Sequence, residues 1–287
     1  MFINLFNISR PHQWVKNFLI FLPLVATHQF KFDYFLNSVP LFISFCLLAS
    51  AVYCYNDIKD LLDDQNHPEK KKRPLASNKI TKKQVYFFIL FLLFSSCLIT
   101  VFFYNINILF TLTAYILLNI LYSNYLKKII LLDILILSFF YLLRIFVGSM
   151  VDNIELTNYF LLFTFSSFIA LASIKRLAEN VKNYNLTSSI YKNYTYLPFI
   201  LALTGILVSL ITFVLYTYSE FATIYYKNIY YLFIAEILIF LWFLRILYLT
   251  KIGKIFYDPV KFVIQDKITW IVVFFVFIIL ISNSNIV

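Results

Sequence analysis

The sequence is poor in the residues that disulfide frameworks and nitrogen or thiolate metal sites need. It has three glycines, three cysteines and three histidines among 287 residues. Cys46, Cys54 and Cys97 lie in or beside apolar runs and have no paired spacing, which excludes a disulfide framework and a zinc site. The histidines form no metal-binding motif either.

Charge is also scarce, and apolar residues dominate. Only 13% of the residues are charged, 62% are hydrophobic, and the mean hydropathy is +0.82. This composition predicts an all-α integral membrane protein with many spans instead of a soluble domain. The net charge of +10 is not gathered in a soluble module. It therefore indicates anionic phosphates and membrane lipid as partners, and no nucleic acid.

Apolar runs predict nine membrane spans in one transmembrane domain over residues 1–287. The first is weak, because Pro23, His28 and Lys31 interrupt it. The N-terminal stretch has no short apolar region with a cleavage site, so we expect an uncleaved anchor. The spans are 18–36, 38–55, 84–103, 106–122, 129–149, 158–174, 195–217, 228–249 and 268–285.

The basic residues predict the orientation. All but four of the 24 Lys and Arg lie in the N-terminal arm or in the loops at 56–83, 123–128, 175–194 and 250–267. The positive-inside rule places these segments in the cytoplasm. We therefore expect a multi-pass protein of the bacterial inner membrane, with a polar cavity and active site facing the cytoplasm.

The stretch from Asn56 to Pro74 concentrates candidate chemistry. Asp57, Asp60 and Asp64 are spaced i, i+3 and i+7, so a continuous helix would place them on one face. Stacked carboxylates repel one another unless a cation lies between them, and such oxygen ligands suit Mg²⁺. A basic run, Lys70 to Arg73, follows and could bind the same phosphates. The alternative is a solvated charged loop that only sets topology.

Other polar residues each have a structural and a functional interpretation. Lys175 and Arg176 end a span, where they snorkel or clamp a phosphate, and Glu179 is an i, i+4 neighbour of Lys175. Asp133 and Arg144 are charges inside a span and are expected to line a polar cavity. The remaining candidates are Glu236 within a span, Arg10 to Asn17 at an interface, Tyr122, Ser123, Lys127 and Lys128 at a short turn, and Asp258 and Asp266 in the last basic loop.

The ordered motifs resemble the UbiA superfamily of membrane prenyltransferases. Asn56, Asp57, Asp60 and Asp64 match its first aspartate-rich motif. The further matches resemble the decaprenyl-phosphate phosphoribosyltransferase branch, which tends to have Gly where this chain has Asn78. They are Arg10-Pro11-x-Gln13-Trp14-x-Lys16-Asn17, His67-Pro68-x-Lys70-x-x-Arg73-Pro74, Tyr141-Leu142-x-Arg144, Gly148, Lys175-Arg176-x-x-Glu179 and the Asp266 region.

The resemblance implies a nine-helix bundle and an Mg²⁺-dependent transfer of 5-phosphoribose. The donor would be phosphoribosyl diphosphate (PRPP), the acceptor decaprenyl or undecaprenyl phosphate, and the product a precursor of cell-envelope arabinofuranose or ribofuranose glycans. A homo-oligomer is compatible with this interpretation. The implied roles are metal binding by Asn56, Asp57, Asp60 and Asp64, the aspartates also being catalytic; donor phosphate binding by Lys70, Arg73, Lys175, Arg176 and Glu179; lipid phosphate binding by Arg10, Gln13, Lys16 and Asn17; and cavity lining by Tyr122, Lys127, Asp133, Tyr141, Arg144 and Asp266.

Two rival functions remain open. An intramembrane prenyltransferase that uses a prenyl diphosphate and an aromatic or other acceptor would share the first motif. It would also be expected to carry a second Asp-x-x-x-Asp motif, where this chain has Lys175, Arg176 and Glu179. A non-enzymatic lipid-phosphate carrier would explain the spans and basic loops but not the aspartate array.

Overall fold

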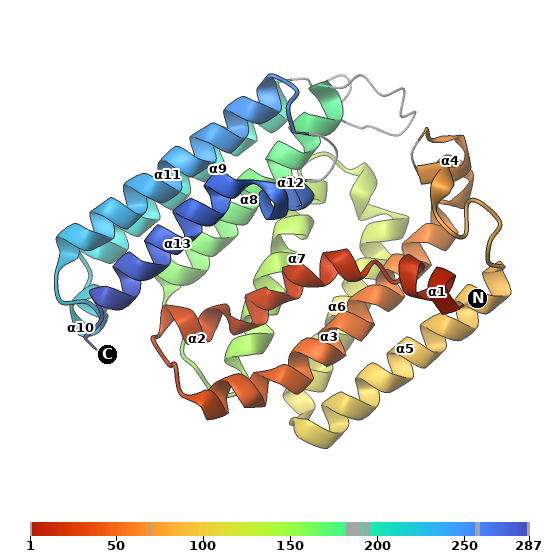
Figure 1. Ribbon diagram of the computed structural model, residues 1–287, viewed down its shortest axis with the longest axis horizontal. Coiled ribbons are helices and arrows are strands. Elements are labelled where there is room, and N and C mark those ends of the chain that lie inside the picture. The colour runs from red at the N-terminus through yellow and green to blue at the C-terminus, as the bar shows by residue number, and fades with distance from the viewer. Residues whose placement is uncertain are drawn as a thin grey trace. The chain divides into compact units, whose positions relative to one another are not determined.

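The computed structural model describes residues 2–68, 70–181, 191, 194, 196–255 and 259–285, which form helices joined by turns (Figure 1). Within these ranges, seven helices are long and apolar enough to cross a membrane. They are α3 (Phe32–Lys59), α5 (Lys82–Phe103), α6 (Ile106–Asn124), α7 (Leu132–Ser149), α8 (Asn158–Val181), α9 (Leu197–Thr217) and α11 (Ile229–Lys251). The second to eighth predicted spans correspond to these helices.

Shorter helices flank or connect the long ones. Among them α13 is apolar but has only 16 residues, so the last predicted span, 268–285, falls on a helix shorter than expected. These elements are α1 (Phe2–Ile8), η1 (Pro11–Phe21), α2 (Leu22–Ala26), α4 (Leu61–Asn66), η2 (Lys70–Lys72), η3 (Leu126–Lys128), α10 (Glu220–Tyr225), α12 (Pro259–Gln265) and α13 (Lys267–Ser282).

The predicted first span over 18–36 is wrong as a single helix. A 3₁₀-helix, η1, ends at Phe21, the short α2 begins beside Pro23, and α3 starts at Phe32. His28 has φ 53°, a left-handed conformation that no α-helix continues through. Proline early in α2 and this left-handed residue after it explain why the apolar run does not form one long helix.

The chain divides into two compact units, residues 1–127 with 143–155 and residues 128–142 with 156–287. In the first unit α3 packs against η1, α5 and α6. Small polar residues allow α3 and α5 to approach closely, since Ser44 Oγ lies 2.8 Å from Ser96 Oγ and 2.9 Å from Thr100 Oγ1. The buried Leu75, Ile80 and Val85 add an apolar core next to α3 and so hold the basic loop against it.

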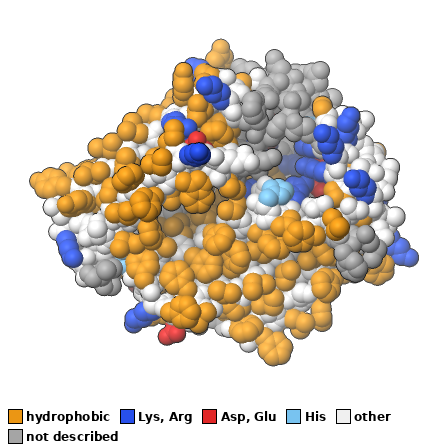
Figure 2. Space-filling view, in the orientation of Figure 1, with side chains coloured by type: hydrophobic (Ala, Val, Ile, Leu, Met, Phe, Trp, Pro, Cys, Tyr) orange, Lys and Arg blue, Asp and Glu red, His pale blue; other side chains and the backbone are white. Residues whose placement is uncertain are grey.

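In the second unit α8 and α9 pack closely, and α11 contacts α8, α9 and α13 (Figure 1). Gly205 lies in the α8–α9 contact, where an added Cβ would come within 2.8 Å of the Ala170 backbone nitrogen. Figure 2 shows one face of the molecule, largely covered by hydrophobic side chains, with Lys and Arg gathered over α4 and the chain beyond it. This surface suits a multi-pass membrane protein.

Candidate functional site

The aspartate motif lies where α3 gives way to α4. Asp57 belongs to the last turn of α3, while Asp60 separates the two helices with φ −92° and ψ 11°. The three aspartates therefore do not lie on one uninterrupted helix. The i to i−4 hydrogen bonds nevertheless continue, because the Asp60 N–H donates to Asn56 O and the Asp64 N–H to Asp60 O, both at 2.8 Å.

Asp57 and Asp64 converge on one guanidinium group. Arg73 Nη1 lies 3.2 Å from Asp57 Oδ1 and 2.5 Å from Asp64 Oδ2, and Arg10 Nη2 also donates to Asp57 Oδ1. The two aspartates are only 3% and 2% exposed. Two buried carboxylates this close would repel each other when both are charged, and the two arginines place positive charge beside them. By contrast Asp63 is exposed.

The other two motif residues contact the end of α6 and the following η3. Asp60 Oδ1 accepts a hydrogen bond from Lys127 Nζ at 2.7 Å, and Asn56 Oδ1 accepts one from Ser123 Oγ at 2.6 Å. The short turn with hydroxyls and cations noted in the sequence therefore contacts the motif directly. Tyr122 is half-buried beside it.

Two of the three motif carboxylates are placed so that they could bind a divalent cation together. Asp64 Oδ1 is buried and has no hydrogen-bond partner among the described residues, so it is available as an oxygen ligand. Carboxylate oxygens are the ligands that Mg²⁺ takes, usually with waters and substrate phosphates completing the shell. Within the described ranges no three His, Cys, Asp or Glu side chains form a ready metal cluster. Asp57 and Asp64 are therefore the candidate pair, and Asp60 lies with Lys127 instead.

The N-terminal motif contributes to the interior of the first unit. Arg10, at φ 53°, begins η1 and reaches Asp57, a contact that the sequence did not predict. Asn17 Oδ1 accepts from Arg144 Nε at 2.9 Å, and Arg144 Nη2 donates to Tyr115 Oη at 3.0 Å. Asn17 and Arg144 thus form a buried polar network. Gln13 is buried and Lys16 half-buried, and their predicted contact with a lipid phosphate stays a prediction.

The second unit holds a separate charged group. Arg176 binds Asp133 through two hydrogen bonds, Nε to Oδ2 at 2.5 Å and Nη2 to Oδ1 at 2.6 Å, and its Nη1 lies 2.6 Å from Glu179 Oε2. Asp133 is fully buried in this network. Arg176 is therefore neutralised by two carboxylates, whereas Lys175 has no ion pair among the described residues. Asp133 and Arg144 take part in separate hydrogen-bond networks, and their predicted place along a polar cavity stays a prediction.

Two further cavity candidates also have defined partners. Asp266 caps α13 by accepting from the Thr269 N–H at 2.9 Å, and it pairs with Arg245 Nη1 at 2.7 Å. Burial alone would raise the pKa of Asp266, but these hydrogen bonds and the Arg245 charge hold its pKa below the ordinary value. Tyr141 stacks on Phe168 with ring centroids 4.9 Å apart. Asp258 lies outside the described residues.

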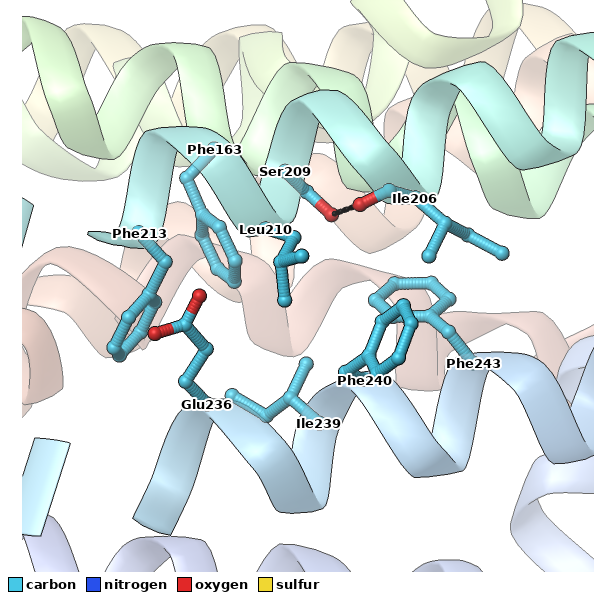
Figure 3. Close-up of a pocket in the computed structure, with 9 residues that line it drawn as sticks. All are labelled: Phe163, Ile206, Ser209, Leu210, Phe213, Glu236, Ile239, Phe240 and Phe243. Atoms are coloured by element: carbon cyan, nitrogen blue, oxygen red, sulfur yellow. Dashed lines mark hydrogen bonds between the residues drawn. The ribbon is translucent and has the colours of Figure 1, made fainter. Parts of the chain in front are cut away.

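Glu236 lines a different pocket, between α8, α9 and α11 (Figure 3). Its carboxyl group points toward Phe163 and Phe213, and its Oε1 has no hydrogen-bond partner among the described residues. The other lining residues are apolar except Ser209, whose hydroxyl donates to Ile206 O at 2.8 Å. Only Glu236 among the lining residues carries a charge, so this pocket offers no cation for a phosphate.

Comparison with known proteins places the chain in a family. The model of the UbiA prenyltransferase family matches residues 18–278. The chain belongs to the UbiA prenyltransferase family. The match covers the long helices of both units. It confirms the resemblance drawn from the motifs and the all-helical membrane class, although the expected number of nine spans is not confirmed.

Curated UbiA relatives include proteins named decaprenyl-phosphate phosphoribosyltransferase. The protein of that name from Mycolicibacterium smegmatis is 32% identical over 61% of this chain and 56% of its own length. The one from Corynebacterium glutamicum is 30% identical over 70% of this chain and 64% of its own length. Nodulation protein NoeC from Azorhizobium caulinodans is 35% identical over 62% of this chain and 58% of its own length. The matched part of this chain thus covers between 56% and 64% of the length of these relatives.

Solved structures share the UbiA fold at low identity. A UbiA homolog from Archaeoglobus fulgidus bound to GPP and Mg²⁺ has a TM-score of 0.70 and 12% identity, covering 96% of this chain and 99% of that one. A digeranylgeranylglyceryl phosphate synthase has a TM-score of 0.66 and 18% identity, covering 98% of both chains. At these identities the similarity establishes the fold and does not identify the substrate.

Sequence reasoning missed the partners of the motif more than the motif itself. Nothing in the local sequence linked Arg10 to Asp57 or Ser123 to Asn56, because these contacts join segments 47 and 67 residues apart. The ion pair of Arg245 with Asp266 could have been suspected from the sequence, because Arg245 lies on a predicted span and a charge at membrane depth is usually paired.

Proposed function

We propose that this UbiA-family protein is an Mg²⁺-dependent membrane transferase that moves 5-phosphoribose from PRPP to a polyprenyl phosphate and releases diphosphate. One observation carries the proposal: two buried aspartates and two arginines form a single cluster at the end of α3. Carboxylates suit a metal ion and guanidinium groups suit phosphate oxygens, so the cluster fits a metal–diphosphate substrate. The names of the curated relatives support the donor and acceptor chosen.

Asp57 and Asp64 would hold the metal ion, with Asn56 and Asp60 as the remaining motif oxygens. When bound, Mg²⁺ supplies neutralisation of the negative charge on the leaving diphosphate. Arg73 and Lys70 would bind phosphate oxygens of the same group, Arg73 through its planar fork and Lys70 as a point charge. Lys127 pairs with Asp60 at the α3–α4 junction.

The reaction breaks the bond from ribose C1 to the diphosphate oxygen and forms a bond from C1 to an oxygen of the lipid phosphate. Its transition state resembles an oxocarbenium ion, as in glycoside cleavage. The lipid phosphate is already an anion, so no side chain has to remove a proton from it. This accounts for a motif built from aspartates and cations.

The other predicted groups keep their roles as proposals. Arg10, Gln13, Lys16 and Asn17 are assigned to the lipid phosphate, although Asn17 and Arg144 also stabilise the interior of the first unit. Of the two cations at the end of α8, Lys175 is the stronger candidate to bind a donor phosphate, because Asp133 and Glu179 already neutralise Arg176. The protein would lie in the bacterial inner membrane with these groups facing the cytoplasm and would supply cell-envelope glycan precursors.

A prenyltransferase is the second candidate, and one observation favours it. The fold-related homolog from Archaeoglobus fulgidus was solved with a prenyl diphosphate, GPP, and Mg²⁺. Its diphosphate has the same chemistry as that of PRPP, so the aspartate cluster alone does not separate the two donors. A non-enzymatic carrier is the third candidate, and it gives no reason for buried aspartates.

A donor test separates the candidates. Purified protein is incubated with Mg²⁺, polyprenyl phosphate and labelled PRPP, and in parallel with a labelled prenyl diphosphate and aromatic acceptors. Label entering lipid only from PRPP supports the proposal, and loss of this label with EDTA or in Asp64→Ala supports the metal role. Prenyl transfer without ribosyl transfer would replace the proposal with the second candidate. Lipid binding that survives EDTA without any turnover would favour the carrier.

A further inference from the structure

One nitrogen atom of Arg73 serves both buried aspartates of the motif. Its Nη1 lies 3.2 Å from Asp57 Oδ1 and 2.5 Å from Asp64 Oδ2. The two aspartates are 3% and 2% exposed, so leaving them ionised without a cation would be costly. Arg73 therefore stabilises the carboxylate pair in the form of the protein that the structure shows.

A divalent cation that bridged Asp57 and Asp64 would compete with the Arg73 guanidinium for the two carboxylates. Two positive groups within a few ångströms repel each other strongly in a site with little water. Such a cation would therefore favour departure of the Arg73 side chain. Asp64 Oδ1 is buried, has no hydrogen-bond partner among the described residues and is not contacted by Arg73, so it could act as the first oxygen ligand.

The surroundings of Arg73 allow its side chain to move while its backbone stays. Its side chain is 26% exposed, so solvent reaches it. Its backbone is fixed in the turn, because the Arg73 N–H donates to Lys70 O and the Ser77 N–H donates to Arg73 O, both at 2.9 Å. Arg10 contacts Asp57, whereas Asp64 pairs with Arg73 alone among the described residues, so departure of Arg73 frees Asp64 in particular.

We propose that Arg73 is a resident counter-ion that the metal displaces, and that the displaced guanidinium then binds a phosphate of the substrate. The inference rests on the proposed function. Displacement of Arg73 makes metal and phosphate binding cooperative. The metal frees the guanidinium that the phosphate binds, and the phosphate holds the guanidinium away from the carboxylates that the metal binds. By linkage, phosphate must raise the affinity for metal by the same factor as metal raises the affinity for phosphate.

The test is Mn²⁺ binding, followed by electron paramagnetic resonance, to purified protein in lipid nanodiscs without substrate. Arg73→Gln removes the competing cation, so we expect it to bind Mn²⁺ at least about tenfold more tightly than the unchanged protein, which is about 1.4 kcal/mol. Arg73→Lys keeps a charge and should bind less tightly than Arg73→Gln. Lys79→Gln is the matched control, because it removes the same charge from an exposed position of the same loop.

Inorganic phosphate supplies the second arm of the test. At saturation it should tighten Mn²⁺ binding in the unchanged protein and do so less in Arg73→Gln, where the displaced cation is missing. Asp64→Asn in the Arg73→Gln background should abolish the gain, which locates the ion at this carboxylate.

Equal or weaker Mn²⁺ binding by Arg73→Gln overturns the counter-ion inference, and so does Mn²⁺ binding that Asp64→Asn leaves unchanged. Transfer of label from PRPP is measured on the same preparations. If the unchanged protein transfers label while Arg73→Gln gains no affinity, the inference fails and the proposed function stands. If label never enters lipid but Arg73→Gln gains affinity, the counter-ion exchange stands and the donor assignment fails.

Discussion

The ion pair between Asp133 and Arg176 should be among the most costly to break in the second unit. Asp133 is 1% exposed and receives two hydrogen bonds from Arg176, at 2.5 and 2.6 Å. Truncating one partner of a buried pair leaves an uncompensated charge and typically costs about 3–5 kcal/mol. In Asp133→Ala, however, Glu179 still contacts Arg176, so we expect the lower end, about 3 kcal/mol.

Thermal unfolding of the purified protein in detergent, followed by circular dichroism, measures this cost. At about 2–4 °C per kcal/mol for a chain of this size class, Asp133→Ala should lower Tm by about 6–12 °C. Lys175→Gln is the control, because it removes a charge from the same helix without breaking an ion pair to any residue that the structure describes. It should change stability by less than about 0.5 kcal/mol.

A double-mutant cycle with Arg176→Ala decides whether the effect belongs to the pair. The double variant should be no less stable than Asp133→Ala alone, because removing both partners leaves no unpaired buried charge. Additive losses in Tm would refute the reasoning, since they would mean that the two side chains stabilise the fold independently. So would an Asp133→Ala variant with the Tm of the unchanged protein.

Three further predictions test other parts of the structure. Gly148→Ala should lower Tm by several degrees, since its Cβ would meet the backbone oxygen of Ile20 at 2.1 Å, and normal expression with an unchanged Tm would contradict this close approach. Because the pKa of Asp266 is depressed in the folded protein, its stabilising contribution is complete above its ordinary pKa of about 4 and is lost as the pH falls below that value. In urea unfolding, Asp266→Asn should therefore lose less stability between about pH 5 and pH 3 than the unchanged protein. Parallel plots of unfolding free energy against pH for the two proteins would contradict the role of Arg245. Glu236→Leu should raise Tm, because it replaces a buried carboxyl group, whose Oε1 has no hydrogen-bond partner among the described residues, with an apolar side chain of similar size; a lower Tm would show that the carboxyl group has a stabilising partner.

The backbone conformation at Asn78 follows from the type of residue at that position. The related branch tends to have Gly here, and Asn is one of the residues that tolerate a left-handed backbone. The structure gives Asn78 a φ of 58°, in the left-handed region, so Asn occupies this position without the usual penalty of a larger side chain. The i to i−4 spacing of Asn56, Asp60 and Asp64 likewise survives in the backbone hydrogen bonds, although the helix itself is interrupted at Asp60.

The sequence alone determined the membrane class, seven of the long helices, the family and the aspartate motif. These follow from local information: apolar runs of sufficient length, and polar residues at fixed spacing. It did not determine where the weak first span would break, because Pro23 and the left-handed His28 act together with the packing of η1 against α3.

Only the tertiary structure decided which charges meet. Asp57, Asp60 and Asp64 have the same chemistry in the sequence, yet two of them share Arg73 while Asp60 pairs with Lys127. Arg176, predicted as a phosphate ligand, pairs with Asp133, 43 residues away, a contact that the sequence did not indicate. A charge pairs with whichever opposite charge the folded helices bring within hydrogen-bond distance, and sequence spacing carries no information on such long-range neighbours.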